Sequence, residues 1–108
     1  MTKRTYRVYV IRLRAEVLAV PRFAKANPGH RPHKPCVYVG STWLSPEERY
    51  AKHLSGIRSS PIVRKYHLAL HKRLTAKQPE FDSRDEAERH EALLASRLRR
   101  RGYAVWSH

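Results

Sequence analysis

The chain has 108 residues, with 23 Lys or Arg against 9 Asp or Glu, which gives a formal net charge of +14. This length suits one domain, residues 1–108, with a single core, and 41% hydrophobic residues argue against a disordered chain. The excess of positive charge indicates a polyanionic partner, with nucleic acid as the first candidate and an anionic membrane surface as the second.

The first third of the chain predicts two paired strands and a long connection. Residues 5–13, TYRVYVIRL, alternate and are rich in β-branched and aromatic side chains, and residues 36–40, CVYVG, form the second strand. Residues 15–35 contain four prolines and predict a basic, proline-rich insertion with one helical turn near its start. Its basic residues either reach along a DNA groove or belong to a disordered flap. They are Arg22, Lys25, His30, Arg31, His33 and Lys34.

A helix is predicted to begin at Ser45, because Ser45 and Glu48 form a capping box around Pro46 at the first helical position. Gly56 is expected to end it. Its buried stripe is expected at Tyr50, Leu54 and Ile57, which are spaced i, i+4 and i+7.

The second half of the chain predicts further helices. Pro61 marks the start of a short helix, whereas residues 67–74, HLALHKRL, fit a helix and a strand equally well. Ser83 and Glu86 form a second capping box, and the helix that follows runs through an arginine-rich end to Gly102. Residues 103–106, YAVW, predict an edge strand.

A carboxylate stands on the inward side of this last helix. Ala87, Leu94 and Leu98 define its core stripe, and Glu91 takes the position where a leucine would be expected, while Glu88 lies at the solvated edge. A buried carboxylate must be paired or bind a cation. An arginine salt bridge and a ligand to a divalent metal both satisfy this requirement, and spacing does not distinguish them.

Residues 38–53 gather further reactive groups. Arg49 and His53 are four residues apart and share a helix face, Tyr38 lies near the end of a strand, and Thr42 begins the turn between them. Each of these residues taken alone is more often structural. Together they suit phosphate chemistry, because arginine holds phosphate oxygens and tyrosine or histidine moves a proton.

These segments resemble the GIY-YIG nuclease family. RVYVIRL is similar to the first motif, with Tyr9, and VYVG is similar to the second, with Tyr38 and Gly40. GSTWLSPEERYAKHLSG follows the family pattern of arginine, histidine and closing glycine at Arg49, His53 and Gly56, and EAERHE resembles the helix that carries the metal-binding glutamate, here Glu91. The resemblance runs from about Tyr6 to the last helix.

The resemblance implies an α+β fold, with a small central antiparallel sheet flanked by helices, and metal-dependent hydrolysis of a DNA phosphodiester. Glu91 would hold one Mg²⁺ or Mn²⁺, and Arg49 would clamp the scissile phosphate. Tyr9 and Tyr38 would orient and deprotonate the attacking water, with His53 assisting. The chain departs from the family in lacking the glycine of the first motif and in its long connection between the tyrosines.

The expected DNA contacts gather around the same segments. They are Gly40, Thr42, Trp43, Lys52, Arg58, Arg64 and Lys65. Gly40 would let the backbone approach a phosphate, and Trp43 would either stack on a base or cap the core. Two weaker metal patterns are His30, His33 and Cys36 for zinc, and the pair His67 and His71.

Other readings remain open at this level. A basic nucleic-acid-binding protein could keep the fold without turnover, and a second protein could supply specificity. No apolar run approaches the roughly 20 residues needed to span a bilayer, and a signal-peptide core is lacking. A membrane-surface protein would need an amphipathic helix with large apolar residues on one face, and the last helix offers only Leu93, Leu94 and Leu98, so no membrane partner is expected. Cys36 is the only cysteine, so no internal disulfide forms, which together with these absences predicts a cytoplasmic protein, nucleoid-associated in a bacterium.

Overall fold

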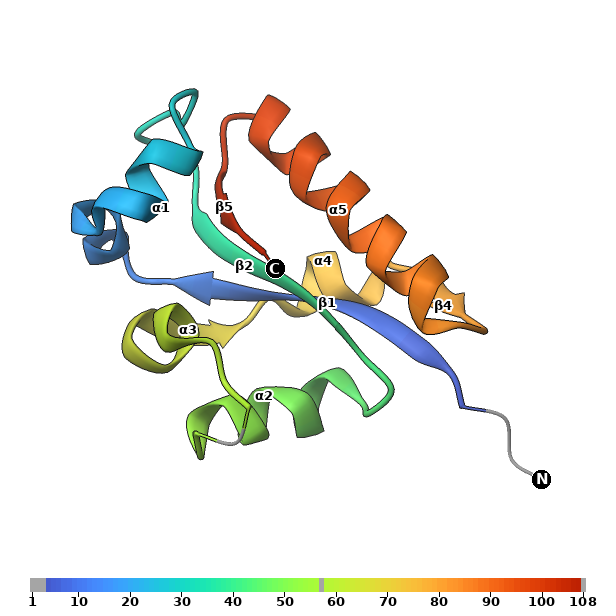
Figure 1. Cartoon of the computed structure of the whole chain (residues 1–108). Helices are drawn as coiled ribbons and strands as arrows, with labels where there is room; N and C mark the ends of the chain where they lie inside the picture. The colour runs from blue at the N-terminus through green and yellow to red at the C-terminus, as the bar shows by residue number, and fades with distance from the viewer. Residues whose placement is uncertain (1–3, 57, 108) are drawn as a thin grey trace.

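The computed structural model describes residues 4–56 and 58–107, which form an α+β fold with a sheet flanked by helices, as expected (Figure 1). The strands are β1 (Tyr6–Leu13), β2 (Cys36–Thr42), β3 (His67–Leu70), β4 (Glu80–Phe81) and β5 (Ala104–Trp106). The helices are η1, a 3₁₀ helix (Ala15–Ala19), α1 (Pro21–Ala26), α2 (Pro46–Leu54), α3 (Pro61–Tyr66), α4 (Lys72–Ala76) and α5 (Arg84–Arg100).

The sheet has the strand order β3-β1-β2-β5, and β4 pairs with the beginning of β1. β1 and β2 are antiparallel, with Tyr9 opposite Gly40 and Ile11 opposite Tyr38. β5 is the exception to the expected antiparallel sheet, because it runs parallel to β2. The chain reverses at Gly102 (φ 93°) after α5, and this turn brings β5 to the edge of β2.

Strand alternation divides the core between the two faces of the sheet. Val8, Val10, Val37 and Val39 pack against α5, which crosses one face of the sheet in Figure 1. Tyr9, Ile11 and Tyr38 lie in the cluster on the other face, together with residues of the insertion and α3. Both tyrosines therefore point to the face that α2 and α3 approach.

The insertion at residues 15–35 is folded, so the reading as a disordered flap is wrong. It contains η1 and α1, more helix than the single turn expected, and the side chains of Val17 and Phe23 are fully buried. The connection also leaves the two tyrosines together, since β1 pairs with β2 from Arg7 to Leu13.

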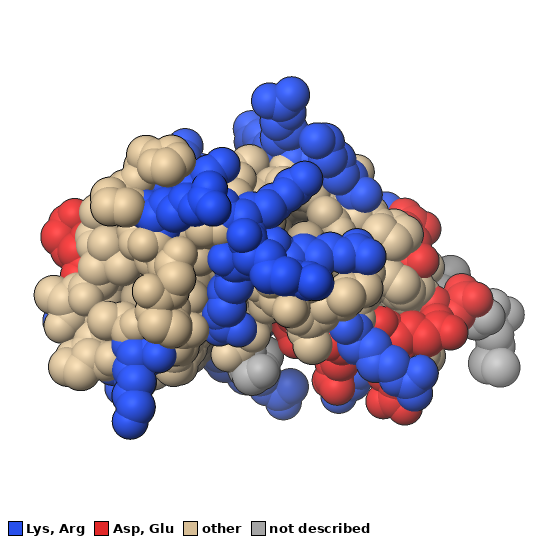
Figure 2. All heavy atoms as spheres, turned by 90° about the horizontal axis from the view of Figure 1, so that it is seen from above, with Lys and Arg blue, Asp and Glu red and all other residues tan. Residues whose placement is uncertain are grey.

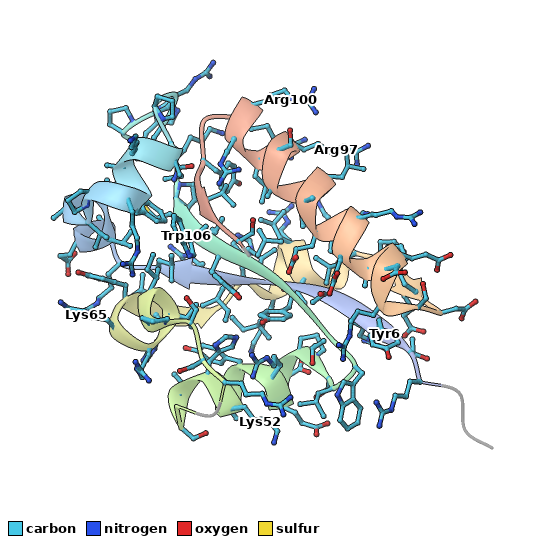
Figure 3. All side chains as sticks on the ribbon, in the orientation of Figure 1. Tyr6, Lys52, Lys65, Arg97, Arg100 and Trp106 are labelled. Carbon is cyan, nitrogen blue, oxygen red and sulfur yellow. The ribbon has the colours of Figure 1, made fainter. Side chains whose placement is uncertain are left out.

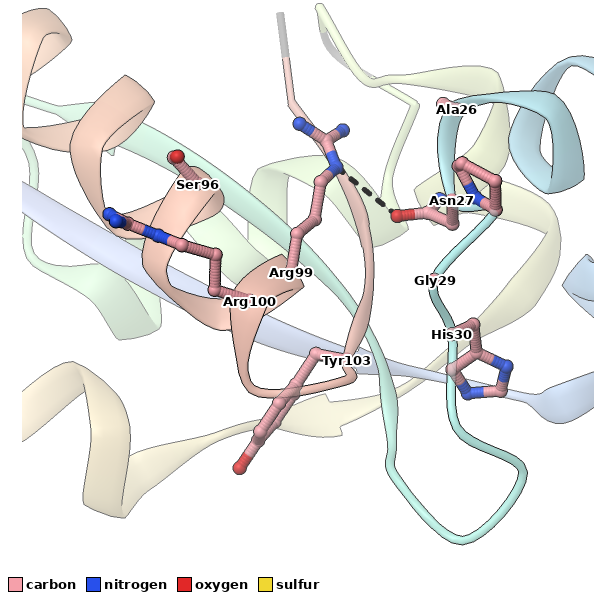
Figure 4. Close-up of a pocket in the computed structure, with 9 residues that line it drawn as sticks. Ala26, Asn27, Gly29, His30, Ser96, Arg99, Arg100 and Tyr103 are labelled. Carbon is pink, nitrogen blue, oxygen red and sulfur yellow. Dashed lines mark hydrogen bonds between the residues drawn. The ribbon is translucent and has the colours of Figure 1, made fainter.

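Asn27 ties the insertion to the rest of the fold (Figure 4). Its buried amide nitrogen donates to the carbonyls of Phe23 (2.8 Å) and Val105 (3.0 Å). Its oxygen accepts from the Val105 backbone (2.7 Å) and from Arg99 Nε (3.2 Å). A small pocket of about 310 Å³ lies beside this network, between the turn after α1 and the end of α5. The network fastens the insertion against β5 and α5.

The helix starts agree with the predicted caps. Ser45 Oγ accepts from the Glu48 backbone (3.2 Å), and Ser83 Oγ accepts in the same way from Glu86 (3.2 Å). α3 begins at Pro61 as predicted. Residues 67–74, which sequence left ambiguous, divide into β3 and the start of α4, which is capped by the His71 side chain.

The predicted stripe of α2 is wrong at Leu54, whereas Tyr50 packs against the core. Leu54 is 46% exposed and Tyr50 is half-buried, whereas His53 is completely buried; Ile57 lies outside the described residues. The reason is the angle of approach, because α2 contacts the sheet with the side that carries His53 against the tyrosines of β1 and β2. The prediction used only the spacing of the apolar residues, which does not reveal the angle at which the helix meets the sheet.

Candidate active site

Three of the predicted residues meet in one buried cluster. Tyr9 and Tyr38 project from neighbouring strands, and α2 brings His53 against both rings. Ring centroids lie 6.2 Å apart for the two tyrosines, and 5.9 and 5.6 Å from Tyr9 and Tyr38 to His53. A hydrogen bond of 2.8 Å joins Tyr9 Oη to His53 Nε2. The cluster contains the proton-carrying groups that sequence predicted.

Gly40 makes this arrangement possible. The Tyr9 ring lies across the backbone of Gly40, so that a Cβ added there would stand 2.5 Å from Tyr9 Oη and 3.0 Å from Tyr38 Cε1. Any side chain at this position would collide with the phenols. The close approach that the structure contains is that of the Tyr9 ring, and the expected approach of the Gly40 backbone to a phosphate stays a prediction.

The environment keeps both phenols protonated. Burial raises the pKa of Tyr9 to about 12, although the charge and hydrogen bond of Arg49 act to lower it. Burial likewise raises the pKa of Tyr38 well above its usual value, and the neighbouring Tyr9 and Glu91 add to the rise. Neither tyrosine is therefore a resident phenolate at neutral pH.

Glu91 is buried in α5 at the position that sequence predicted, with 5% of its surface exposed. Its Oε1 has no hydrogen-bond partner, and no ion pair joins it to any of residues 4–56 or 58–107. The predicted salt bridge is thus absent from the described part of the chain. Burial raises the pKa of Glu91 to about 7, with a further contribution from Glu88.

Glu91 lies within electrostatic reach of the tyrosine cluster, because its charge raises the pKa of both Tyr9 and Tyr38. Among the described residues, no three His, Cys, Asp or Glu side chains gather into a metal-binding group. A Mg²⁺ ion does not need such a group, since it is commonly held by one or two carboxylates together with water and substrate phosphate. The unpartnered oxygen of Glu91 fits that pattern.

Arg49 connects the cluster to an open groove. Its side chain interacts with Tyr9 and donates from Nη2 to the Arg58 carbonyl (2.8 Å). The groove has a volume of about 460 Å³ and lies between the β2–α2 connection and the beginning of α5. Its lining residues are Tyr6, Ser41, Thr42, Trp43, Leu44, Arg49, Lys52, Arg58, Arg84 and Glu88. Four cations and one carboxylate line it, so the groove is electropositive.

No match is found when the chain is compared with models of protein families, with curated proteins or with solved structures. The geometry and chemistry of the site therefore carry the functional argument.

The predicted DNA-contacting residues divide between the groove and other places. Thr42, Trp43, Lys52 and Arg58 line the groove, and Thr42 Oγ1 accepts from the Leu44 backbone (3.0 Å), which shapes the turn. Gly40 is buried in the sheet. Arg64 and Lys65 are exposed on α3 and do not line it.

Sequence reasoning missed Tyr6, Arg84 and Glu88 as groove residues. Tyr6 begins β1, whereas Arg84 and Glu88 belong to the first turns of α5, and only the packing of α5 on the sheet brings them beside Trp43. Arg84 follows the predicted cap at Ser83. A basic residue at the start of a helix was the one sequence feature that could have pointed to its place in the groove.

A second basic surface lies on the α5 side of the sheet. In Figure 2, Lys and Arg side chains gather across the middle of this face, and acidic side chains lie at its left and right edges, most of them at the right. Lys77, Arg97, Arg100 and Arg101 line a groove of about 550 Å³ between α4 and the C-terminal half of α5. This surface contains the arginine-rich helix end that sequence singled out.

Among the described residues, His30, His33 and Cys36 do not form a metal-binding group of three. The side chains of the other weak pattern, His67 and His71, make separate contacts. His71 caps α4, and His67 contacts Tyr50 through a long hydrogen bond of 3.4 Å. No helix in the described part of the chain is long and apolar enough to cross a membrane.

Proposed function

We propose that this protein is a metal-dependent DNA endonuclease with an active site of the GIY-YIG type. The observation that carries the proposal is a convergence of side chains distant in sequence. Tyr9, Tyr38 and His53 form one hydrogen-bonded cluster, Arg49 links it to a cationic groove, and the buried Glu91 has an oxygen without a partner. Burying a carboxylate without a partner costs free energy, and such groups gather at functional sites.

Glu91 is the residue that would hold the metal. Its Oε1 is buried and unpartnered, and hard divalent cations prefer carboxylate oxygen. A bound Mg²⁺ or Mn²⁺ would supply charge stabilisation to the phosphate in the transition state. A cation at this position would also offset the cost of burying the ionised carboxylate.

Tyr9 and His53 form a path for the proton of the attacking water. Arg49 and Tyr38 both make hydrogen bonds to Tyr9 that lower its pKa, and Tyr9 Oη is hydrogen-bonded to His53 Nε2 (2.8 Å). In the relay that we propose, Tyr9 donates in this last bond and His53 Nε2 accepts. The attacking water would take the place of Arg49 or Tyr38 at the phenol oxygen. As the water gives its proton to that oxygen, the phenol would pass its own proton to His53 Nε2. This relay requires no free phenolate, which a pKa of about 12 would make scarce at neutral pH.

Replacing Tyr9 with phenylalanine is expected to slow cutting by about 10²–10⁴-fold, because it removes the relay oxygen and keeps the ring. Metal-free binding of DNA should change little. Single-turnover cleavage rates measure the effect, with Tyr103→Phe, between α5 and β5, as a matched control. Wild-type cutting by the Tyr9→Phe variant would contradict the relay.

Arg49 is the residue that would clamp the phosphate. A guanidinium holds two phosphate oxygens at once and keeps its charge throughout the reaction. Lys52, Arg58 and Arg84 in the same groove would bind neighbouring phosphates, so binding should weaken steeply with salt. A DNA substrate would place the protein in the cytoplasm, at the nucleoid in a bacterium, and a partner protein could supply sequence preference.

A cleavage screen tests the proposal against a basic DNA-binding protein without turnover. Plasmid, linear duplex, flap and branched DNA are offered with and without Mg²⁺ or Mn²⁺. Cutting should require the metal and should be lost in both Glu91→Gln and Arg49→Ala. Undiminished cutting by both variants would refute the assignment of the site. Salt-sensitive binding without any cutting would favour the non-catalytic protein.

A further inference from the structure

The cationic groove also presents aromatic surface. Trp43 stands in the connection between β2 and α2, and 48% of its surface is exposed. The structure thus excludes the reading in which it caps the core. Tyr6, half-buried at the start of β1, lines the same groove. In Figure 3 the labelled Tyr6 lies at the right, near the beginning of β1, and Lys52 lies on α2, below the sheet.

The Trp43 ring is already in contact with a cation. The Arg4 guanidinium lies 4.5 Å from the ring centroid, within the range of a cation–π interaction. Arg4 is itself exposed, so it can contact a phosphate while it remains over the ring or can move to admit another planar group. The ring therefore stands among Arg4, Arg49, Lys52, Arg58 and Arg84.

We propose that this groove binds an unpaired stretch of DNA, with one base stacked on Trp43. This inference rests on the proposed function and names its substrate class. Grooves that bind single strands combine positive charge along the backbone path with aromatic faces on which bases stack. In a continuous duplex the base faces are covered by their neighbours, so a stacking platform has no use there. A flap, a gap or a frayed end exposes the face that Trp43 would accept.

The position of the platform connects it to the chemistry. Arg49 lines the same groove as Trp43 and interacts with Tyr9 in the buried cluster. A base held on Trp43 would place a neighbouring phosphate beside Arg49, because adjacent groups along one strand occupy adjacent parts of the groove. The substrate would then be recognised by an unpaired base near the bond that is cut.

Fluorescence and binding in EDTA test the inference without any cutting. The chain has two tryptophans, and Trp106 lies in β5, packed beside Phe23 (ring centroids 6.2 Å apart). A single-stranded oligonucleotide should quench the fluorescence of wild type and of Trp106→Phe but should not quench Trp43→Phe. Trp43→Ala should weaken single-strand binding by about 10-fold or more. Its affinity for a blunt duplex should change by less than about twofold. Trp43→Phe should keep most of the affinity.

Matched controls separate stacking from charge and from surface apolarity. Leu93→Ala removes an exposed apolar side chain on α5 outside this groove, and Arg73→Ala removes an exposed cation on α4 outside it. Equal loss of duplex and single-strand binding in Trp43→Ala would overturn the inference, as would quenching that persists in Trp43→Phe. Emission from Trp43 that responds to anionic phospholipid vesicles and not to the single strand would also overturn it.

The outcomes distinguish this inference from the proposed function. Single-strand binding through Trp43 in a protein that cuts no DNA would leave the stacking site in place and refute the nuclease. Metal-dependent cutting that Trp43→Ala leaves unchanged on flap and duplex DNA alike would support the nuclease and refute the stacking site.

Discussion

Substitution of Glu91 by glutamine is expected to reduce metal-dependent cutting by about 10³-fold or more, because it removes the buried, unpartnered carboxylate that would hold a metal near the tyrosine cluster. DNA binding in EDTA should be retained, since Glu91 does not line the cationic groove. Loss of activity with retained binding would identify a role in the chemical step.

The same substitution is expected to make the protein more stable than wild type at high pH, although it lowers activity. Burial raises the pKa of Glu91 from 4.5 to about 7, so the folded state holds its proton more tightly than the unfolded chain does. The protonated Glu91 carboxyl makes its full favourable contribution to the free energy of unfolding below about pH 4.5. This contribution is lost as pH rises through 7. Allowing for solvent screening, the loss is about 2 kcal/mol at pH 8.

Thermal unfolding in EDTA measures this effect. The Tm of Glu91→Gln relative to wild type should rise between pH 4.5 and 8, by roughly 8 °C in all for a domain of this size. Glu86→Gln, at an exposed carboxylate in the first turn of α5, should show no such rise. A Tm difference that stays constant with pH would contradict the raised pKa of Glu91.

Metal binding gives a readout that is independent of cutting. Mg²⁺ or Mn²⁺ should raise the Tm of wild type at pH 8, because a bound cation relieves the buried charge and binds only the folded state. The Glu91→Gln variant should respond much less. Equal stabilisation of the two proteins by metal would place the ion elsewhere.

The features predicted well from sequence are those that neighbouring residues determine. Ser45 and Ser83 cap their helices through a backbone group three residues away, so the predicted starts agree with the structure. Glu91 was found in the same way, because a carboxylate within an apolar stripe stands out at helical spacing. These patterns depend on a few residues that lie close together in the chain.

The features missed depend on contacts between distant segments. Asn27 holds the insertion through hydrogen bonds to Arg99 and Val105, and nothing in a proline-rich segment signals those partners. The direction of β5 follows from the turn at Gly102, and the inward position of His53 follows from the angle at which α2 meets the sheet. The basic groove likewise exists only because α5 packs beside the β2–α2 connection.

Two residues of the site are unusual for their positions, each for a different reason. Glu91 has an unpaired oxygen that a cation could satisfy, and Gly40 has no side chain, which leaves room for the Tyr9 ring. Burial of Glu91 costs free energy, and the missing Cβ of Gly40 leaves room for the hydroxyl of Tyr9. Both raise the energetic demands of folding at the place where the reactive groups meet.

Replacing Gly40 with alanine is therefore expected to damage both stability and activity. The new Cβ would lie 2.5 Å from Tyr9 Oη and 2.6 Å from Tyr9 Cζ, so the phenol must move or the strands must separate. Overpacking of this kind costs about 1–3 kcal/mol, and a displacement of about 1 Å in a reactive group can slow a reaction 10²-fold. Thermal unfolding and single-turnover cleavage measure the two effects.

Gly29→Ala is the matched control, because a Cβ at Gly29 meets no atom within 4 Å and the backbone there is not left-handed. It should leave cutting unchanged and Tm unchanged or slightly higher. A double-mutant cycle locates the clash: in a Tyr9→Ala background, Gly40→Ala should cost much less stability than in wild type, since the atoms that it meets at closest distance are gone. Equal costs in the two backgrounds would mean that the glycine is required for the strand itself and not for the phenol.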